Sequence, residues 1–108
     1  MSKKIGRFEL KNEGVFIARM DADYRVNGST WTRVHLTGDI LTLQNDSADP
    51  GEHNVPDGAD VRLVGHIVAG TDKIASRTFT YMRGNNHSAR YAISGLITDP
   101  TLALIERT

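Results

Sequence analysis

A period-two alternation of side chains runs through residues 16–26 of the 108-residue chain. Its even positions are all apolar, while four of its odd positions carry charge, namely Arg19, Asp21, Asp23 and Arg25. Successive side chains of a β-strand point to opposite faces, whereas a helix would scatter the same apolar residues around its circumference. The run therefore predicts a half-buried strand whose four charged side chains form a solvent-facing ladder.

Weaker versions of this pattern recur along the chain, separated by turn-forming residues about every dozen positions. They cover residues 5–10, 30–36, 39–43, 59–69, 74–83, 89–97 and 101–106. Residues 59–69 carry apolar side chains on both faces, as expected of a central strand that is covered on both sides. About eight short strands in a chain of one-domain length predict an all-β fold, a single-domain antiparallel β-sandwich over residues 1–108.

The turn at residues 84–88 sets the register of one predicted hairpin. A five-residue loop would place Tyr81 opposite Tyr91 and Phe79 opposite Ile93, so that one apolar ladder runs down the pair. A shift by one residue would send the aromatic side chains to opposite faces. We therefore expect a hairpin in which these four residues face the core.

The charge balance and the absence of cysteine exclude several classes of function. Thirteen Lys and Arg residues balance thirteen Asp and Glu residues, so the formal net charge is zero. That balance offers nucleic acid or an acidic membrane no long-range attraction. A chain without cysteine has no disulfides, no thiolate catalysis and no cysteine-ligated zinc. No apolar run predicts a signal peptide or a transmembrane helix, so we expect a cytoplasmic protein, although signal-independent export fits the same sequence.

Counting chain reversals predicts where the polar loops lie. When every strand crosses the full height of a sandwich, successive connections alternate between its two ends. The turns at 11–14, 37–39, 70–73 and 98–100 then fall at one end, and those at 27–30, 44–58 and 84–88 at the other. This count assumes that residues 37–39 reverse the chain.

The second set of loops is rich in side chains that suit a binding site. Binding residues are often found on clustered loops at one end of a rigid sandwich, although ordinary solvated loops have a similar composition. The residues that we expect to contact a ligand are Asn27, Ser29, Trp31, Asp49, Glu52, His53, Asn85, Asn86 and His87. Trp31 has two interpretations: a buried anchor of the sandwich, which is the commoner fate, or a platform on which a sugar ring stacks.

Metal binding is a minor alternative in the same region. Asp46, Asp49 and Glu52 supply the hard oxygens that calcium prefers, but an EF-hand register fails because Ala48 and Pro50 would occupy ligand positions. The four histidines show no ligand spacing typical of zinc. Apart from this calcium alternative, we expect no cofactor.

No catalytic or phosphate-binding motif stands out, which leaves a binding role as the leading expectation. We expect a non-enzymatic module that binds a polar ligand, with carbohydrate as the first class, because amide, carboxylate and hydroxyl groups supply directional hydrogen bonds. One alternative is a structural subunit that forms homo-oligomers through sheet edges or faces. Another is a lipid-surface or pore-forming protein, which the small number of aromatic residues disfavours. The expected partner is a carbohydrate or a protein surface.

Overall fold

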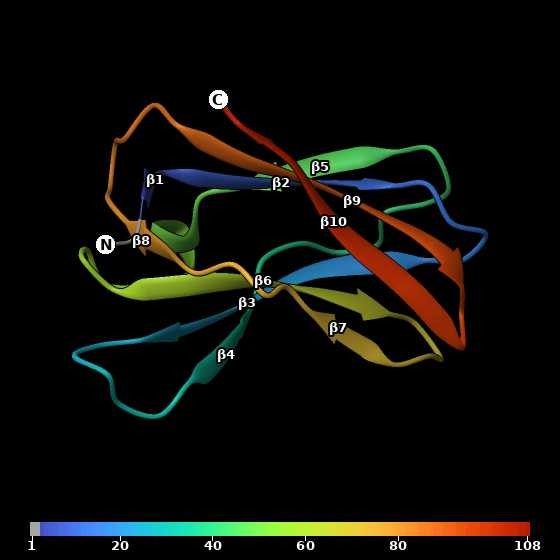
Figure 1. Cartoon of the computed structure of the whole chain (residues 1–108), viewed down its shortest axis with the longest axis horizontal. Coiled ribbons are helices and arrows are strands. Elements are labelled where there is room, and N and C mark those ends of the chain that lie inside the picture. The colour runs from blue at the N-terminus through green and yellow to red at the C-terminus, as the bar shows by residue number, and fades with distance from the viewer. Residues whose placement is uncertain (1–2) are drawn as a thin grey trace.

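The computed structural model describes residues 3–108, and nearly all of its regular structure is β-strand (Figure 1). A single 3-10 turn, η1, spans Pro50–His53 within this range. The strands are β1 (Lys4–Ile5), β2 (Arg7–Asn12), β3 (Ala18–Arg25), β4 (Thr32–His35), β5 (Asn45–Ala48), β6 (Asp60–Ile67), β7 (Asp72–Ile74), β8 (Phe79–Tyr81), β9 (Ser88–Leu96) and β10 (Asp99–Arg107).

Two sheets pack face to face and confirm the predicted β-sandwich (Figure 1). The six-stranded sheet has the order β1-β8-β6-β3-β4, with β7 also paired to β6, and the four-stranded sheet has the order β10-β9-β2-β5. Most neighbouring strands are antiparallel, but β1 runs parallel to β8 and β2 runs parallel to β9. Those two parallel pairs join the beginning of the chain to its last third, one in each sheet.

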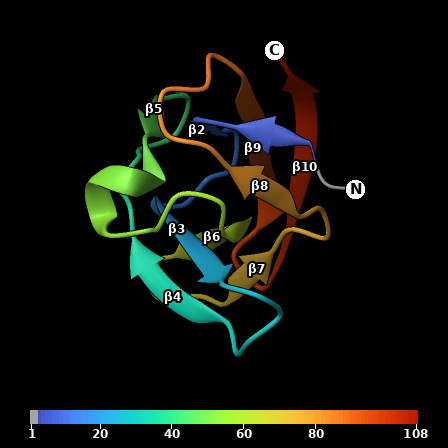
Figure 2. The same cartoon turned by 90° about the vertical axis from the view of Figure 1, so that its left-hand side faces the viewer.

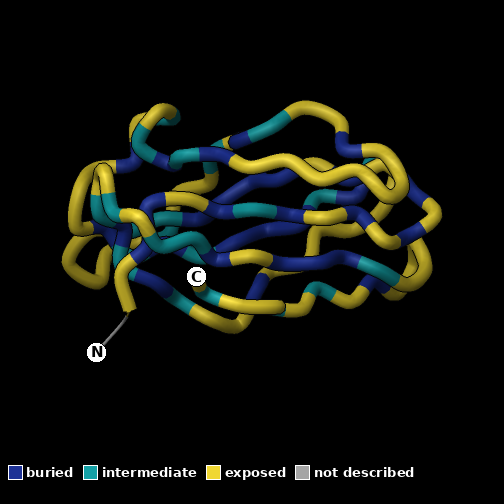
Figure 3. The backbone as a smooth tube through the Cα atoms, turned by 90° about the horizontal axis from the view of Figure 1, so that it is seen from above, coloured by how far each residue is buried: buried dark blue, intermediate teal, exposed yellow. Residues whose placement is uncertain are grey.

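The alternation in residues 16–26 gives the strand that it predicts. Ala18, Met20 and Ala22 of β3 are fully buried between the sheets, as are Phe8 and Leu10 of β2. The central position predicted for residues 59–69 is also confirmed, because β6 pairs with β3 along one edge and with β7 and β8 along the other. Figure 3 shows buried residues along the strands in the middle of the molecule, with exposed residues at both ends and along the outer strands.

Residues 39–43 do not form the predicted strand. The chain from Leu36 to Ile40 stays beside β3, with the amides of Leu36 and Thr37 both bonded to the Met20 carbonyl and Ile40 bridged to Ala18. The reversal comes instead at residues 41–44, where the Gln44 amide donates to the Leu41 carbonyl. The strand that follows this turn is β5, six residues later than the pattern predicts.

The hairpin predicted around residues 84–88 is wrong. Residues 74–83 are not one strand, because β7 ends at Ile74 and β8 spans only Phe79–Tyr81. β8 pairs with β1 and β6 rather than with β9. The chain then crosses to the other sheet. Tyr81 and Tyr91 therefore lie in different sheets, and each faces the core between them. All four residues of the predicted ladder are nonetheless buried. Phe8 joins them, with its ring centroid 6.4 Å from that of Phe79 and 6.3 Å from that of Tyr91.

Candidate functional site

The three polar connections lie at the same end of the molecule, on the left in Figure 1 and facing the viewer in Figure 2. They are the turn after β3, the segment that contains η1, and the crossing from β8 to β9. The reversal at residues 41–44 replaces the one expected at 37–39, so the number of reversals is unchanged. Counting reversals therefore placed these segments correctly, although one turn was misplaced by a few residues.

Two of the three segments are joined by hydrogen bonds. The Asp49 carboxylate accepts the Gly51 amide at 2.9 Å, which caps η1, and it also accepts the hydroxyl of Tyr81. From the β8 side, Arg83 donates its backbone amide to Asp57 at 2.7 Å and its guanidinium to the Gly51 carbonyl at 3.2 Å. Burial and the Asp49 carboxylate raise the pKa of Tyr81 above its ordinary value, so this phenol stays a donor. Asp49 thus holds the loop in shape.

The remaining predicted residues are spread over the margin of this end. The Asn85 side chain accepts the His87 amide at 2.9 Å, and the His87 ring bonds to the Thr108 carbonyl. Asn86, Glu52, Asn27 and Ser29 are exposed, and His53 is half-buried. Within residues 3–108, the 27–30 turn makes no hydrogen bond to either of the other two segments. Figure 2 shows this turn at the opposite margin from the β8–β9 crossing.

The carboxylates considered for calcium are not brought together. Asp46 belongs to β5, where its side chain accepts the Ser47 amide, and Asp49 is occupied by Gly51 and Tyr81. Across the described part of the chain, no three His, Asp or Glu residues are placed to hold a metal ion.

Trp31 is not the buried anchor that was the favoured interpretation. Its ring is half-buried on the outer surface of the six-stranded sheet, with the guanidinium carbons of Arg25 and Arg62 at 4.2 and 4.1 Å from the ring centroid. It precedes β4, an edge strand, so its side chain covers neighbouring arginines instead of entering the core. Cation–π contacts of this kind stabilise an aromatic ring outside a core.

The charged ladder of β3 is only partly solvent-facing: Arg19 is exposed as predicted, but the two aspartates are not. Asp21 and Asp23 are each only 3% exposed. Asp23 accepts hydrogen bonds from Arg33 at 2.8 Å and from Arg62 at 3.1 Å, which come from the neighbouring strands β4 and β6. Burial acts to raise the pKa of Asp23, but the hydrogen bonds and charges of the two arginines outweigh it, and the pKa is lowered. We interpret this network as a brace between strands, because its carboxylate is ionised and fully paired.

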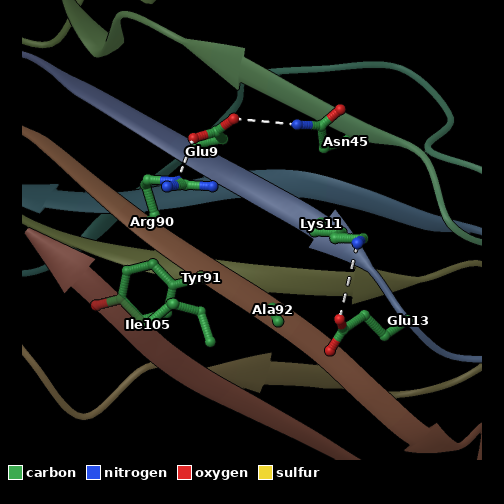
Figure 4. Close-up of a pocket in the computed structure, with 8 residues that line it drawn as sticks. All are labelled: Glu9, Lys11, Glu13, Asn45, Arg90, Tyr91, Ala92 and Ile105. Carbon is green, nitrogen blue, oxygen red and sulfur yellow. Dashed lines mark hydrogen bonds and ion pairs between the residues drawn. The ribbon is translucent and has the colours of Figure 1, made fainter.

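A hollow of about 170 Å³ lies on the outer face of the four-stranded sheet, at a place that sequence reasoning missed (Figure 4). Ala92 lies in its middle, opposite Lys11 of the adjacent strand. Its lining residues are Glu9, Lys11, Glu13, Asn45, Arg90, Tyr91, Ala92 and Ile105. The depression exists because a methyl group stands among much longer side chains.

Paired charges of both signs form the walls of the hollow. Arg90 donates to Glu9 at 2.8 Å, and Asn45 donates to the other oxygen of Glu9 at 3.1 Å. Lys11 and Glu13 stand 4.0 Å apart with about half of each side chain exposed. The strand β10 shifts register between Leu104 and Glu106, which leaves Ile105 unpaired at the rim. Bulges of this kind often re-aim a side chain beside a site.

Sequence signals for this hollow were weak. The alternation in β2 and β9 identifies which side chains point outward, but the hollow needs β2 beside β9 in parallel and β5 on the other edge. Neither pairing follows from short turns between consecutive strands.

Within residues 3–108, no helix has the length and apolar composition needed to cross a membrane. No protein-family model and no curated protein matches the sequence, and no solved structure matches the fold.

Proposed function

We propose that the protein is a non-enzymatic binding module and that its ligand is a small, neutral, hydroxyl-rich molecule, with carbohydrate as the first class. The site is the hollow around Ala92 on the four-stranded sheet. The observation that carries this proposal is the ring of donors and acceptors around a small apolar floor.

The chemistry of the lining groups favours hydroxyl ligands. A hydroxyl both donates and accepts, so it can bridge an ammonium or guanidinium donor and a carboxylate acceptor. Lys11 and Arg90 supply the donors, and Glu9 and Glu13 supply the acceptors. Two positive and two negative groups leave no net charge to attract an anion or a cation. The methyl of Ala92 and the side chain of Ile105 offer apolar contact to the C–H groups of a sugar ring.

The size of the hollow limits what it can hold. About 170 Å³ corresponds to the liquid volume of roughly five or six water molecules. We therefore expect one ring-sized unit, such as a monosaccharide or the end of a glycan, with only part of its surface covered. Affinity for a single unit should be weak, because a shallow site buries little of the ligand.

A titration followed by two-dimensional amide NMR tests the proposal. Adding a panel of neutral mono- and disaccharides should shift the amide signals of residues 9–13, 45 and 90–92. Ala92→Leu should abolish the shifts by filling the hollow, and Lys11→Gln should weaken binding about tenfold through loss of a charged donor. Lys73→Gln is the matched control, since Lys73 is an exposed lysine on β7 of the other sheet.

Two outcomes would overturn the assignment of the site. Absence of any shift at millimolar sugar would argue against the ligand class. Shifts restricted to residues 27–30, 50–58 and 84–88 would move the site to the three-loop end that the sequence predicts. Lys11→Gln keeps the test informative if Ala92→Leu lowers the melting temperature.

A further inference from the structure

The end of the sandwich opposite the polar loops exposes aliphatic side chains on its turns. Val15 is 82% exposed, Leu43 is 72% exposed and Leu96 is 63% exposed, and three other aliphatic side chains nearby are more than a third exposed. We call this surface the aliphatic end; it comprises Val15, Ile17, Leu41, Leu43, Leu96 and Ile97. Its turns lie on the right in Figure 1.

These residues form one surface because their turns contact one another. The Leu43 amide donates to the Asn12 carbonyl at 2.6 Å, and the Thr42 hydroxyl donates to the Gly14 carbonyl at 2.8 Å. On the other side, the Val68 amide donates to the Ile17 carbonyl at 2.9 Å. Gly70, in the turn after β6, packs closely against Ile97, because a Cβ atom added at Gly70 would lie 2.9 Å from the Ile97 Cγ1 atom. Contiguous exposed apolar patches usually mark interaction sites.

Local backbone preference does not explain the leucine at position 43. Its φ of 68° lies in the left-handed region, which glycine and asparagine adopt much more readily. A turn at the surface would be more stable with either of those residues. A large apolar side chain is therefore kept in a strained conformation and in contact with water, which indicates that the side chain serves a contact.

We propose that the aliphatic end is the contact surface for a second copy of the same chain, related by a two-fold axis. Charges beside the patch occur in pairs of opposite sign, Lys11 with Glu13 and Arg19 with Asp39. Two such surfaces can face each other without net repulsion, and each cation can approach the partner's anion. The balanced charges give no net electrostatic attraction to an acidic membrane. The patch also lacks the aromatic residues and excess cations of lipid-binding surfaces.

The size of the patch indicates a weak dimer. Six aliphatic side chains are far fewer than the roughly 20–30 residues that each partner contributes to a standard interface. We therefore expect an equilibrium that depends on protein concentration in the micromolar to millimolar range.

Sedimentation velocity over a hundredfold range of concentration tests this inference. The wild-type weight-average mass should rise from that of one chain towards that of two, and Leu43→Asp should keep it at one chain throughout. Leu43→Asn is a second variant that should fold at least as stably, because asparagine tolerates the left-handed conformation, and it should still weaken association at least tenfold. Asn86→Asp is the matched control, since it adds the same charge at the opposite end.

Three results would overturn the inference. They are a wild-type protein that stays monomeric at every concentration, a Leu43→Asp variant that still dimerises, and an Asn86→Asp control that loses dimerisation. Co-sedimentation with phosphatidylcholine vesicles by a monomeric wild-type protein would assign the aliphatic end to a lipid surface instead.

Discussion

Asn12 and Tyr91 are both buried, but they differ in their hydrogen bonds. The Asn12 side chain donates to the carbonyls of Phe16 and Ile40 at 2.6 and 2.9 Å and accepts the Gly14 amide at 2.9 Å. The hydroxyl of Tyr91 has no hydrogen-bond partner among residues 3–108. A satisfied buried polar group supports a fold, whereas an unsatisfied one costs about 1–3 kcal/mol.

The three bonds of Asn12 make it the residue on which the turn after β2 depends. Asn12→Ala leaves the Phe16 carbonyl and the Gly14 amide without partners, and the Ile40 carbonyl keeps only its bond from the Ala18 amide. The free energy of unfolding should therefore fall by about 2–4 kcal/mol. Urea denaturation measures the loss, with Asn86→Ala as the control because Asn86 is exposed. A loss below about 1 kcal/mol would contradict the proposed bracing role.

Removing the hydroxyl of Tyr91 should not destabilise the protein. Tyr91→Phe discards an unpartnered group, so at neutral pH we expect an unchanged or higher free energy of unfolding, by up to about 1 kcal/mol. A clear loss of stability would show that the hydroxyl has a partner after all.

The pH dependence of stability gives a second readout of the same residue. Burial raises the pKa of Tyr91 from 10.0 to about 12, although the charge of Arg77 acts in the opposite direction. Between pH 10 and about 12, the folded protein therefore keeps the Tyr91 proton that the unfolded chain loses. The resulting stabilisation is fully present below pH 10 and is lost as the pH rises towards 12. Denaturation between pH 8 and 12 should show a smaller decline for Tyr91→Phe than for the wild type.

At the scale of elements, β3, β4 and β6 are fastened on their outer face by the buried Asp23. The pattern of β3 correctly predicted its inner face, because hydrophobic periodicity reports burial on one side. The pattern could not show that Asp21 and Asp23 are buried too, since their partners Arg33, His35 and Arg62 come from strands whose pairing is set by the whole sheet.

Replacing this carboxylate should loosen the three strands together. Asp23→Asn removes the anion of Arg62 and leaves Arg33 with Asp72 alone. We expect a loss of about 2–4 kcal/mol at neutral pH, below the value for a fully buried pair because both arginines are partly exposed. Since the pKa of Asp23 is lowered from 3.8, the wild-type advantage is present above that pH and declines as pH falls through the lowered value.

Asp39→Asn provides the control for this comparison. Asp39 pairs with Arg19 at 2.7 Å, but both side chains are almost half exposed, so its loss should change stability by less than about 1 kcal/mol. Equal effects of the two substitutions, measured by urea denaturation, would contradict the bracing role of Asp23.

For the whole molecule, the sequence predicted the two-layer architecture and the distribution of polar loops, but it did not predict the hollow. Strand faces and chain reversals are local properties, so period-two patterns and turn residues carry that information. The hollow depends on which strands become neighbours, and β2 beside β9 brings together residues 9–13 and 90–92 from distant parts of the chain. Long-range pairing of this kind is decided by packing that no short segment encodes.

The polarity of the two ends was only half predicted for a related reason. Polar composition indicated the loop end, but the aliphatic end is made of six exposed residues, two on each of three separate turns. Each one is unremarkable alone, because isolated surface aliphatics are common. Only the contacts between those turns make them one patch.

The parallel pairing of β2 with β9 has a consequence for synthesis. A nascent chain leaving the ribosome carries residues 7–12 long before residues 88–96 are made, so for most of translation β2 lacks one of the two neighbours that it has in the finished sheet. Closing a loop across nearly the entire chain is slow because its entropy is lost before the contacts form. During that interval the open edge of β2 is a template for another copy, so chaperone occupancy should be highest before Ser88 emerges.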